Sequence, residues 1–486
     1  MTSVPASPAD PPAGASPRRG ELAARLAAAM PGVRADLEAL VRIPSVSLAS
    51  FDAEQVRRSA DAVVDLLRAE GLTAHTVTVA DGHPAVLAHR PGPPGAPRVL
   101  LYAHHDVQPP GEEADWLSAP FEPTERDGRL FARGAADDKA GIMAHVAALR
   151  ILRDELDAGL DIDLRLLIEG EEEVGSDSLP AILAEHAQEL DCDAIVLADS
   201  ANWAVGTPAL TTTLRGNVRV VVTVTALRHG VHSGMFGGAA PDALTALCRL
   251  MATLHTPDGT VAVRGLTSDT ASDLDYPEDA FRADSGMPPD APLIGSGSVV
   301  SRIWSQPAIT VIGIDAPAVD AAANLLLPRA RAKISARLAP SQDWCSAFEA
   351  LRAHLLANAP WGTSVEVTLE DHGNGFVAAT SGPYVDAARA AFAAAWGTDP
   401  VDVGIGGSIP FIAEFADRFP GAAILVTGVE DPDTRAHGAN EGLHLGEFER
   451  VCLAEALMLD RIGRMRSSQA ESASSSPGSD PAAGDG

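Results

Sequence analysis

Cysteine is scarce in this sequence and follows no pattern. The chain of 486 residues has only four cysteines, and they lie far apart (Cys192, Cys248, Cys345 and Cys452). Because such scattered cysteines are typical of neither a disulfide framework nor a thiolate zinc site, we expect neither. The first 20 residues also lack the apolar central segment of a secretory signal peptide. We therefore predict a protein of the reducing cytoplasm.

Basic residues are few compared with acidic ones. The chain has 36 Lys and Arg against 66 Asp and Glu, which gives a formal net charge of −30. A field of that sign repels phosphate backbones and anionic lipid surfaces, so we expect no nucleic-acid or membrane partner. Long apolar runs are missing too, since none reaches the length of about 18 residues that a membrane span needs.

The hydrophobic fraction, 46%, is nevertheless that of a folded protein. The length exceeds what one hydrophobic core usually organises, so we predict two domains. Both ends are low in complexity, and residues 1–19 and 467–486 are predicted to be disordered. A helix is predicted over residues 21–42, with a break at Pro31.

Between residues 20 and 206, short aliphatic runs alternate with helical patterns. The runs lie at residues 99–103, 164–169 and 194–198. Such alternation is typical of an α/β fold with a mostly parallel sheet. Residues 374–466 again show alternating helical and aliphatic segments, and they are predicted to complete the same domain.

Residues 207–373 have a different pattern and are predicted to form a second domain inserted into the first. Its strands are expected at residues 217–226, 308–314, 330–338 and 364–370. Helices are expected after Pro241 and after Ser341. The resulting order, βαββαβ, is that of a ferredoxin-like sandwich.

Acidic residues and histidines follow the predicted strands of the first domain at the points where these strands end. They are His104 and Asp106 in HHDVQP, Asp137 and Asp138 in RGAADDK, the glutamates 171–173 in EGEEEVGS, Asp199, and His437 in RAHGANEG. Taken alone, each has an ordinary explanation: a satisfied histidine, a helix N-cap, a solvated acidic loop or a turn. The carboxyl ends of parallel strands meet at one edge of a sheet, so we expect these side chains to converge.

Two imidazoles and three or more carboxylates at one sheet edge are the ligands of a two-zinc site bridged by a carboxylate. A further carboxylate beside the metal ions could deprotonate water, and the adjacent Glu172 and Glu173 could divide the tasks of base and ligand. The residues alone therefore indicate a hydrolytic metal centre.

Together these motifs resemble the dizinc metallopeptidase family that includes carnosine-type dipeptidases, glutamate carboxypeptidase, acetylornithine deacetylase and succinyl-diaminopimelate desuccinylase. The resemblance extends from about residue 20 to residue 465. It implies two Zn²⁺ ions per chain, with Mn²⁺ or Co²⁺ as alternatives, and five ligands: His104, Asp137 as the bridging residue, Glu173, Asp199 and His437. The family's general base matches Glu172, and the residue that orients its first ligand matches Asp106. The resemblance also implies a cis peptide bond between Asp137 and Asp138.

The inserted domain resembles the family's lid, through which its members form homodimers. His232 in GVHSG matches a lid histidine that stabilises the oxyanion in the neighbouring subunit. Arg337 in KISARLAP matches an arginine that binds a substrate carboxylate, and Gly407 and Ser408 in GGSIP match a loop that contacts the substrate. Without the resemblance, His232 is a turn residue and Arg337 lies on a solvated sheet surface. The resemblance favours the functional interpretation of both.

The sequence therefore predicts a dizinc hydrolase that cleaves the amide bond of dipeptides or short peptides with a free C-terminal carboxylate. An N-acyl amino acid deacylase with the same centre is the alternative, although the HHDVQP, EGEEEVGS and HSGMFGG segments are more similar to the dipeptidase branch. A metal-binding scaffold without turnover is a third interpretation. Glu172 argues against it, because a scaffold needs no base.

Overall fold

The computed structural model describes residues 17–270, 272–407 and 410–474 of the chain. The chain divides into two compact units. The first unit contains the residues up to 210, residues 379–401 and those from 416 onward, and the second contains residues 211–378 and 402–415. The insertion was predicted at residues 207–373, with residues 402–415 in the first domain.

A mostly parallel sheet forms the centre of the first unit, and its first six strands have the order β1-β2-β6-β3-β7-β17, after which β8 (Ala209–Leu214) and β15 (Phe376–Val377) follow. The strands are β1 (Thr73–Val77), β2 (Ala85–Arg90), β3 (Arg98–His104), β6 (Asp163–Glu169), β7 (Ala194–Leu197) and β17 (Ala423–Val426). The pairs β6–β3, β3–β7 and β7–β17 are parallel, whereas β1–β2 and β2–β6 are antiparallel. β3 and β7 are buried almost throughout, which is typical of parallel strands covered on both faces. The predicted α/β class is confirmed.

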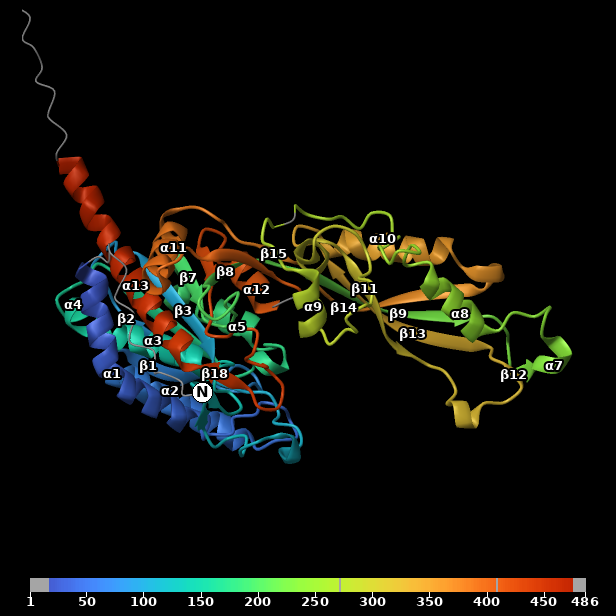
Figure 1. Ribbon diagram of the computed structural model, residues 1–486, viewed down its shortest axis with the longest axis horizontal. Coiled ribbons are helices and arrows are strands. Elements are labelled where there is room, and N and C mark those ends of the chain that lie inside the picture. Colours follow the sequence, from blue (N-terminus) through green and yellow to red (C-terminus); the bar gives the residue numbers. More distant parts are fainter. Residues whose placement is uncertain (1–16, 271, 408–409, 475–486) are drawn as a thin grey trace, which may run out of the picture. The chain divides into compact units, whose positions relative to one another are not determined.

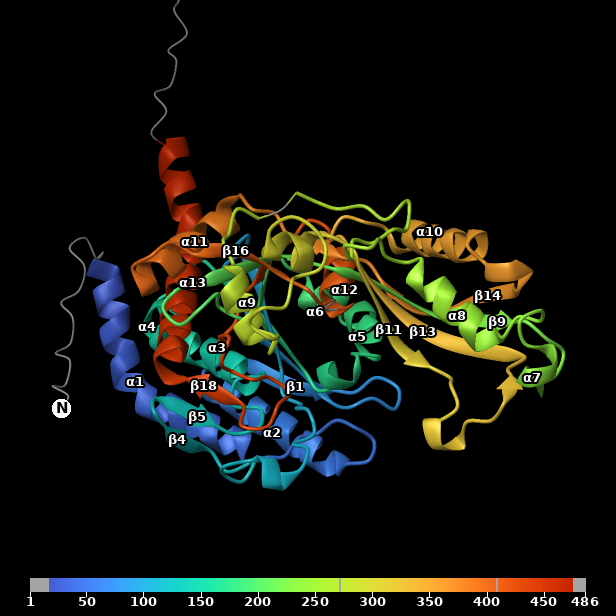
Figure 2. The same ribbon diagram turned by 45° about the vertical axis from the view of Figure 1, so that its right-hand side comes forward.

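Helices pack against this sheet and against one another. α3 (Lys139–Ile151) packs on β3 and is almost fully buried, and α1 (Pro17–Val41) and α13 (Leu445–Ser474) pack on α3. These three helices lie side by side in both ribbon views (Figure 1 and Figure 2). The other helices of the unit are α2 (Ala53–Ala69), α4 (Arg153–Asp157), α5 (Leu179–Glu185), α6 (Ala187–Leu190) and α11 (Pro383–Trp396). Among the described residues, no helix has the length and hydropathy that crossing a membrane needs.

The predicted break at Pro31 is wrong, because α1 continues through this proline. A proline inside a helix removes one backbone hydrogen bond. Leu26, Val33 and Leu37 on the same helix are buried in the core, and this packing outweighs the loss.

Both predicted disordered ends overlap with helices. α1 begins at Pro17, within the predicted arm of residues 1–19, and α13 extends to Ser474, within the predicted tail of residues 467–486. The other residues of the arm before Pro17 and of the tail after Ser474 lie outside the described residues.

A small antiparallel sheet joins distant loops of the first unit. Its order is β18-β5-β4, with β4 at Thr124–Arg126, β5 at Arg129–Phe131 and β18 at Gly442–His444. Gly442 pairs with Phe131. The segment that precedes Asp137 therefore lies beside the segment that follows His437.

The second unit contains a four-stranded antiparallel sheet of order β11-β13-β9-β14. The strands are β9 (Gly216–Thr225), β11 (Ala308–Ile314), β13 (Arg329–Leu338) and β14 (Ser364–Gly373). Helices α8 (Ala243–Ala252) and α10 (Trp344–Ala357) share one hydrophobic core with the sheet. Along the chain the elements follow as β9, α8, β11, β13, α10 and β14, so the structure has the predicted βαββαβ order.

Shorter elements complete the second unit and its boundaries. They are β8 (Ala209–Leu214), β10 (Val231–His232), β12 (Leu325–Leu326), β15 (Phe376–Val377), β16 (Val401–Ile405), α7 (Ser233–Phe236), α9 (Glu278–Asp284) and α12 (Pro410–Arg418). The N–H of Arg215 donates to the carbonyl of Ile405 at 3.3 Å, and the Thr212 hydroxyl donates to the carbonyl of Val403 at 3.4 Å. These bonds explain why residues 402–415 belong with the second unit.

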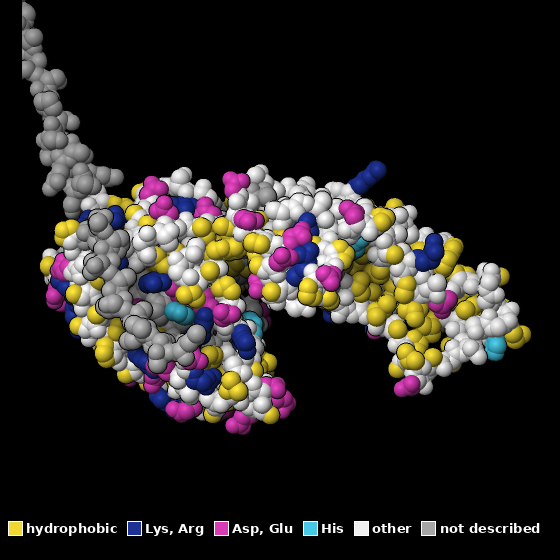
Figure 3. Space-filling model, in the orientation of Figure 1, with side chains coloured by type: hydrophobic (Ala, Val, Ile, Leu, Met, Phe, Trp, Pro, Cys, Tyr) yellow, Lys and Arg dark blue, Asp and Glu magenta, His cyan; other side chains and the backbone are white. Residues whose placement is uncertain are grey.

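Hydrophobic side chains are exposed on the edge strand β11. Val311, Ile312 and Ile314 are 41%, 50% and 47% exposed. Figure 3 shows hydrophobic side chains gathered over the strands of this unit. An apolar edge strand with unpaired backbone groups is a surface to which another strand can add.

Candidate metal centre

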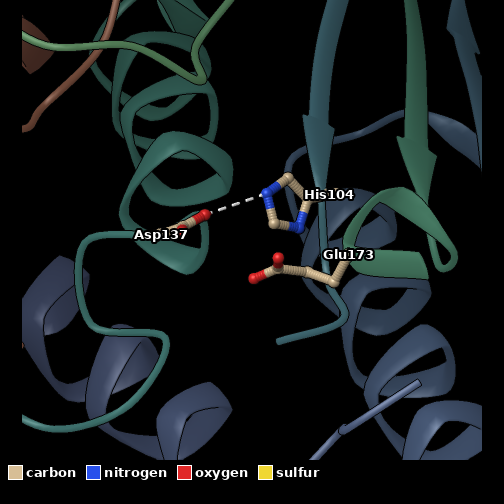
Figure 4. A group of neighbouring side chains, drawn as sticks. All are labelled: His104, Asp137 and Glu173. Carbon is tan, nitrogen blue, oxygen red and sulfur yellow. Dashed lines mark hydrogen bonds and ion pairs between the residues drawn. The ribbon is translucent and has the colours of Figure 1, made fainter. Parts of the chain in front are cut away.

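The predicted metal ligands converge at the carboxyl ends of the parallel strands. His104 is the last residue of β3, the adjacent glutamates 172 and 173 follow β6, and Asp199 follows β7. The ligand atoms of His104, Asp137 and Glu173 all lie within 4.8 Å of one another, and so do those of His104, Glu172 and Asp199. Figure 4 shows the first group, whose side chains point toward one another from separate segments. The structure therefore brings these residues together.

Each oxygen of the Asp137 carboxylate faces one imidazole. Oδ1 is 3.1 Å from Nε2 of His104, and Oδ2 is 3.0 Å from Nε2 of His437. Nδ1 of His104 donates to the main-chain carbonyl of Asp106 at 3.1 Å, so Nε2 is the ring atom left for a ligand. Burial raises the pKa of Asp137, but the hydrogen bonds with the two histidines outweigh it and hold this pKa below its ordinary value. The peptide bond between Asp137 and Asp138 is cis, as the resemblance implied.

Two buried aspartates hold the backbone around these ligands. Asp106 accepts the N–H of Glu172 at 3.3 Å and that of Glu173 at 3.1 Å, and its Oδ1 is 3.5 Å from Nδ1 of His104. Asp138 accepts the N–H of His104 at 3.2 Å. Asp106 thus connects the end of β3 to the loop after β6, a contact that the sequence did not indicate.

The adjacent glutamates have different surroundings. The side chain of Glu173 is 2% exposed, and its carboxylate accepts the N–H of Gln108 at 3.0 Å and the Gln108 side-chain amide at 2.7 Å. The side chain of Glu172 is 20% exposed, and its Oε2 is 4.0 Å from Nε2 of His104. Its carboxylate makes no hydrogen bond within the described ranges. Glu173 is therefore held in place, whereas the carboxylate of Glu172 can turn.

The carboxylates of the site raise one another's pKa. Burial, followed by the charge of Asp137, raises the pKa of Glu173 to about 10, and the same two causes raise the pKa of Asp199 to about 6. Burial and the charge of Asp199 also raise the pKa of Glu172 well above its ordinary value. A divalent cation among these carboxylates would neutralise their repulsion. Imidazole and carboxylate are also the donors that zinc and similar ions bind, so the residues fit the predicted metal ions.

Three residues near the site were not predicted from the sequence. Gln108 and Glu441 each stand four positions after a predicted histidine ligand, a spacing that was visible but had no assigned meaning. Glu430 lies in the loop after β17, where burial, followed by the charge of Asp137, raises its pKa well above the ordinary value. It is a further carboxylate beside the predicted ligands.

The loop that carries His437 has an unusual backbone. Arg435, His437 and Asn440 have positive φ angles of 58°, 63° and 62°, a conformation that is uncommon for residues other than glycine and that His and Asn adopt more readily than Arg. The side-chain amide of Asn440 donates to the carbonyl of Asp115 and accepts the N–H of Leu117, both at 2.8 Å. The loop depends on such contacts with the rest of the unit to keep its shape.

The other predicted site residues lie in the second unit. His232 is exposed in β10, and its Nδ1 accepts the N–H of Gly234 at 3.1 Å. Arg337 is half-buried in β13, and Gly407 is half-buried after β16. Ser408 lies outside the described residues. The roles of these four residues stay predictions.

A buried arginine lies close to this predicted substrate loop. Nε of Arg215 donates to the carbonyl of Gly406 at 3.0 Å. Burial, followed by the charge of Arg337, lowers the pKa of Arg215 to about 10. Two neighbouring guanidinium groups favour the binding of an anion.

A peptidase family and several dipeptidases are similar to this chain. The model of peptidase family M20/M25/M40 matches residues 100–461. The cysteinylglycine-S-conjugate dipeptidase of Corynebacterium striatum is 35% identical over 374 residues, which cover 76% of this chain and 82% of that protein. The Cys-Gly metallodipeptidase dug1 of Schizosaccharomyces pombe is 28% identical over 386 residues, which cover 75% and 80%. The crystal structure of human carnosine dipeptidase 1 has the same fold, with a TM-score of 0.72 and 23% identity, over 93% of this chain and 100% of that one.

Proposed function

The chain belongs to peptidase family M20/M25/M40 and is a metal-dependent hydrolase, and we propose that it is a dizinc dipeptidase. Its substrates are dipeptides or short peptides with a free C-terminal carboxylate. The dipeptidase names of the relatives from Corynebacterium striatum and Schizosaccharomyces pombe support this substrate class. The structural arrangement that supports the proposal most directly is the carboxylate of Asp137 with one imidazole on each oxygen.

Five residues are proposed to hold two Zn²⁺ ions, with Mn²⁺ or Co²⁺ as alternatives. His104 and Asp199 would serve one ion and Glu173 and His437 the other, while Asp137 is shared. Two contacts support this division: Glu173 lies 3.4 Å from His437, and Asp199 shares a group with His104. His104 also shares a group with Glu173, and the carboxylate of Asp137 belongs to that group. When bound, the ions supply positive charge that polarises the scissile carbonyl and makes a water easier to deprotonate.

Glu172 is the proposed general base. It takes a proton from the attacking water and later gives it to the leaving amine. Its carboxylate has no hydrogen bond in the described part of the chain that would restrain it, so it can reach both partners. The carboxylate of Glu173 is restrained, because Gln108 donates a hydrogen bond to each of its oxygens. Asp106 is proposed to orient His104.

Residues of the second unit are proposed to bind the rest of the substrate. Arg337 would bind the free C-terminal carboxylate, and Gly407 and Ser408 would contact the peptide. The neighbouring guanidinium of Arg215 adds to the positive charge around Arg337. The imidazole of His232 would stabilise the oxyanion in the partner subunit's site.

The proposed assembly is a homodimer formed through the second unit, which would act as a lid. The exposed apolar side chains of the edge strand β11 support an interface between two copies. We further propose a cytoplasmic location, which fits the four free cysteines.

A substrate panel tests the proposed activity. The metal-loaded protein is incubated with dipeptides, tripeptides and N-acetyl amino acids, and released free amine is measured. Rapid release from dipeptides is the expected result. Preferential release from N-acetyl amino acids would instead identify the alternative, an N-acyl amino acid deacylase, and no release from any substrate would leave a metal-binding scaffold.

A further inference from the structure

The carboxylate of Glu441 lies inside the loop that carries Asp137. Glu441 is fully buried. Its Oε1 accepts the N–H of Ala136 at 2.9 Å and that of Asp137 at 3.2 Å, and its Oε2 accepts the N–H of Gly134 at 3.1 Å. Its main-chain carbonyl accepts the N–H of Ala132 at 3.1 Å. The segment that leads to Asp137 is therefore folded around one carboxylate.

Arg133 supplies the opposite charge and extends these contacts to a second loop. The side chain of Arg133 is 1% exposed, and its Nη1 donates to Oε2 of Glu441 at 2.6 Å. Its Nη2 donates to the carbonyl of Gly438 at 3.2 Å and to that of Pro109 at 3.3 Å. Because Gly438 directly follows His437, the ion pair contacts the loops of two predicted metal ligands.

A contribution to the stability of the fold is a poor explanation for this buried ion pair. Removing two charges from water carries a penalty that their attraction often does not exceed, so a buried ion pair is weak evidence for stabilisation. The two loops that the ion pair joins must also be held in a defined conformation. The loop of His437 contains three residues other than glycine with positive φ angles, so contacts with neighbouring segments must keep its shape.

We propose that Arg133 and Glu441 are a positioning pair, which fixes the Asp137 carboxylate and the His437 imidazole at the spacing that the metal ions require. This role rests on the proposed metal centre but not on the proposed substrate. Contacts that orient ligands raise metal affinity because less order must be created when the ion binds.

Metal affinity of the Glu441→Gln variant tests the pair. The full-length chain is stripped of metal with a chelator, and Zn²⁺ binding is measured by titration calorimetry. The amide keeps the size of the side chain and one acceptor oxygen, but it places an NH₂ group where Arg133 and Gly134 donate. We expect Zn²⁺ to bind about 10- to 100-fold more weakly, the usual effect of losing a contact that orients a ligand.

Glu70→Gln is the matched control. Glu70 is also a buried carboxylate that accepts from a guanidinium, that of Arg150 at 2.8 Å, but neither residue contacts a predicted ligand in the described ranges. This variant should lower the melting temperature while leaving Zn²⁺ affinity unchanged. If Glu441→Gln lowers the melting temperature in the same way and still binds Zn²⁺ like the unsubstituted protein, the pair is only structural and the proposal is overturned.

Arg133→Lys provides a second variant in case Glu441→Gln does not fold. It keeps the positive charge but loses the branched guanidinium group, whose second nitrogen donates to the carbonyls of Gly438 and Pro109. Zn²⁺ affinity should again fall, and unchanged affinity would contradict the proposal. An unsubstituted chain that binds two ions but hydrolyses no peptide would refute only the proposed activity, whereas one that binds no metal would refute the metal centre and this role together.

Discussion

Glu172 and Glu173 have the same chemical groups, and their neighbours make them different. Two N–H donors of Gln108 fix the carboxylate of Glu173, while that of Glu172 has no such donor in the described ranges. A metal ligand benefits from being held in place before the ion binds, whereas a base that passes a proton from water to a leaving group must reach both. The contacts therefore favour Glu173 as the ligand and Glu172 as the base.

Substituting each glutamate by glutamine separates the two roles. Glu172→Gln should lower kcat by about 10²- to 10⁴-fold, the usual contribution of a general base, with metal content nearly unchanged. Glu173→Gln should instead lose bound metal. Both quantities can be measured on the same preparations, by steady-state kinetics and by elemental analysis. If the two variants exchange these results, the assignment within the three glutamates is shifted by one residue.

The imidazole of His437 is expected to bind metal directly. It lies 3.0 Å from Asp137 and 3.4 Å from Glu173. Metal analysis of the His437→Ala variant should show a substantial loss of about one of two ions per chain. His229→Ala, which removes an exposed histidine of the second unit, is the control and should keep both ions. Two tightly bound ions in the His437→Ala protein would remove this residue from the site.

The predicted ligands could be found in the sequence because each stands next to a recognisable strand end or in a family motif. Gln108 and Glu441 could not, because their function lies in a contact with a distant part of the chain. Gln108 bonds to a residue 65 positions away, and Glu441 bonds to the N–H of a residue 305 positions away. Local patterns indicate burial and secondary structure, but they do not name the partner of a buried polar group.

Among the elements, helices α3 and α13 are joined by a buried ion pair. Nδ1 of His145 in α3 lies 2.7 Å from Glu455 in α13, and its Nε2 lies 3.0 Å from the carbonyl of Tyr102. A carbonyl and a carboxylate both accept hydrogen bonds, so the ring is bonded on both sides when it is protonated. Burial lowers the pKa of His145, but the charge of Glu455 and these hydrogen bonds outweigh it and raise the pKa above its ordinary value.

This pair predicts a pH-dependent stability. Since the folded pKa of His145 is higher than the unfolded value of about 6.5, its stabilisation is fully present below that pH and is lost as the pH rises through the folded pKa. Each unit of pKa shift corresponds to about 1.4 kcal/mol. Urea unfolding of the unsubstituted protein and of His145→Gln should therefore differ most near pH 6 and less near pH 9. A difference that is constant or grows with pH would show that His145 is not protonated in the fold.

The secondary elements were largely predictable, because burial of aliphatic runs is visible in the sequence. Residues 164–169 and 330–338 were predicted as strands and lie within β6 and β13. The break at Pro31 was wrong because the cost of one proline was visible while the packing of α1 on α3 was not. The association of residues 402–415 with the second unit depends on hydrogen bonds to residues near 212–215, which no local pattern indicates.

In the whole molecule, the proposed site needs residues from two chains. The predicted ligands and Glu172 belong to the first unit, and His232 belongs to the second, from where it would serve the partner subunit. A group that stabilises the oxyanion acts mainly in the transition state, and its loss usually lowers the rate by about 10²- to 10³-fold. Loss of Arg337 should chiefly weaken the binding of substrates that carry a carboxylate.

Mixing two inactive variants tests the sharing of residues between subunits. Glu172→Gln and His232→Ala each damage one component of every site. After subunit exchange, about half of the dimers should be mixed, and each should have one intact site of two, so roughly a quarter of the original activity should return. Exchange is verified by mass or by a fluorescent label. Verified exchange without recovered activity would mean that His232 serves its own chain or takes no part in the chemistry.

The residues with positive φ angles in the loop around His437 also affect how quickly a protease can cut the chain. A loop in unfavourable backbone conformations opens more readily than its surroundings once a bond that holds it is lost, and a metal ion bound to His437 would be such a bond. Arg435 is exposed in this loop and offers a trypsin cleavage site. Trypsin should therefore cut after Arg435 faster in the metal-free chain than in the metal-loaded one, and equal rates would contradict this coupling. The supply of metal would then set the lifetime of the chain as well as its activity.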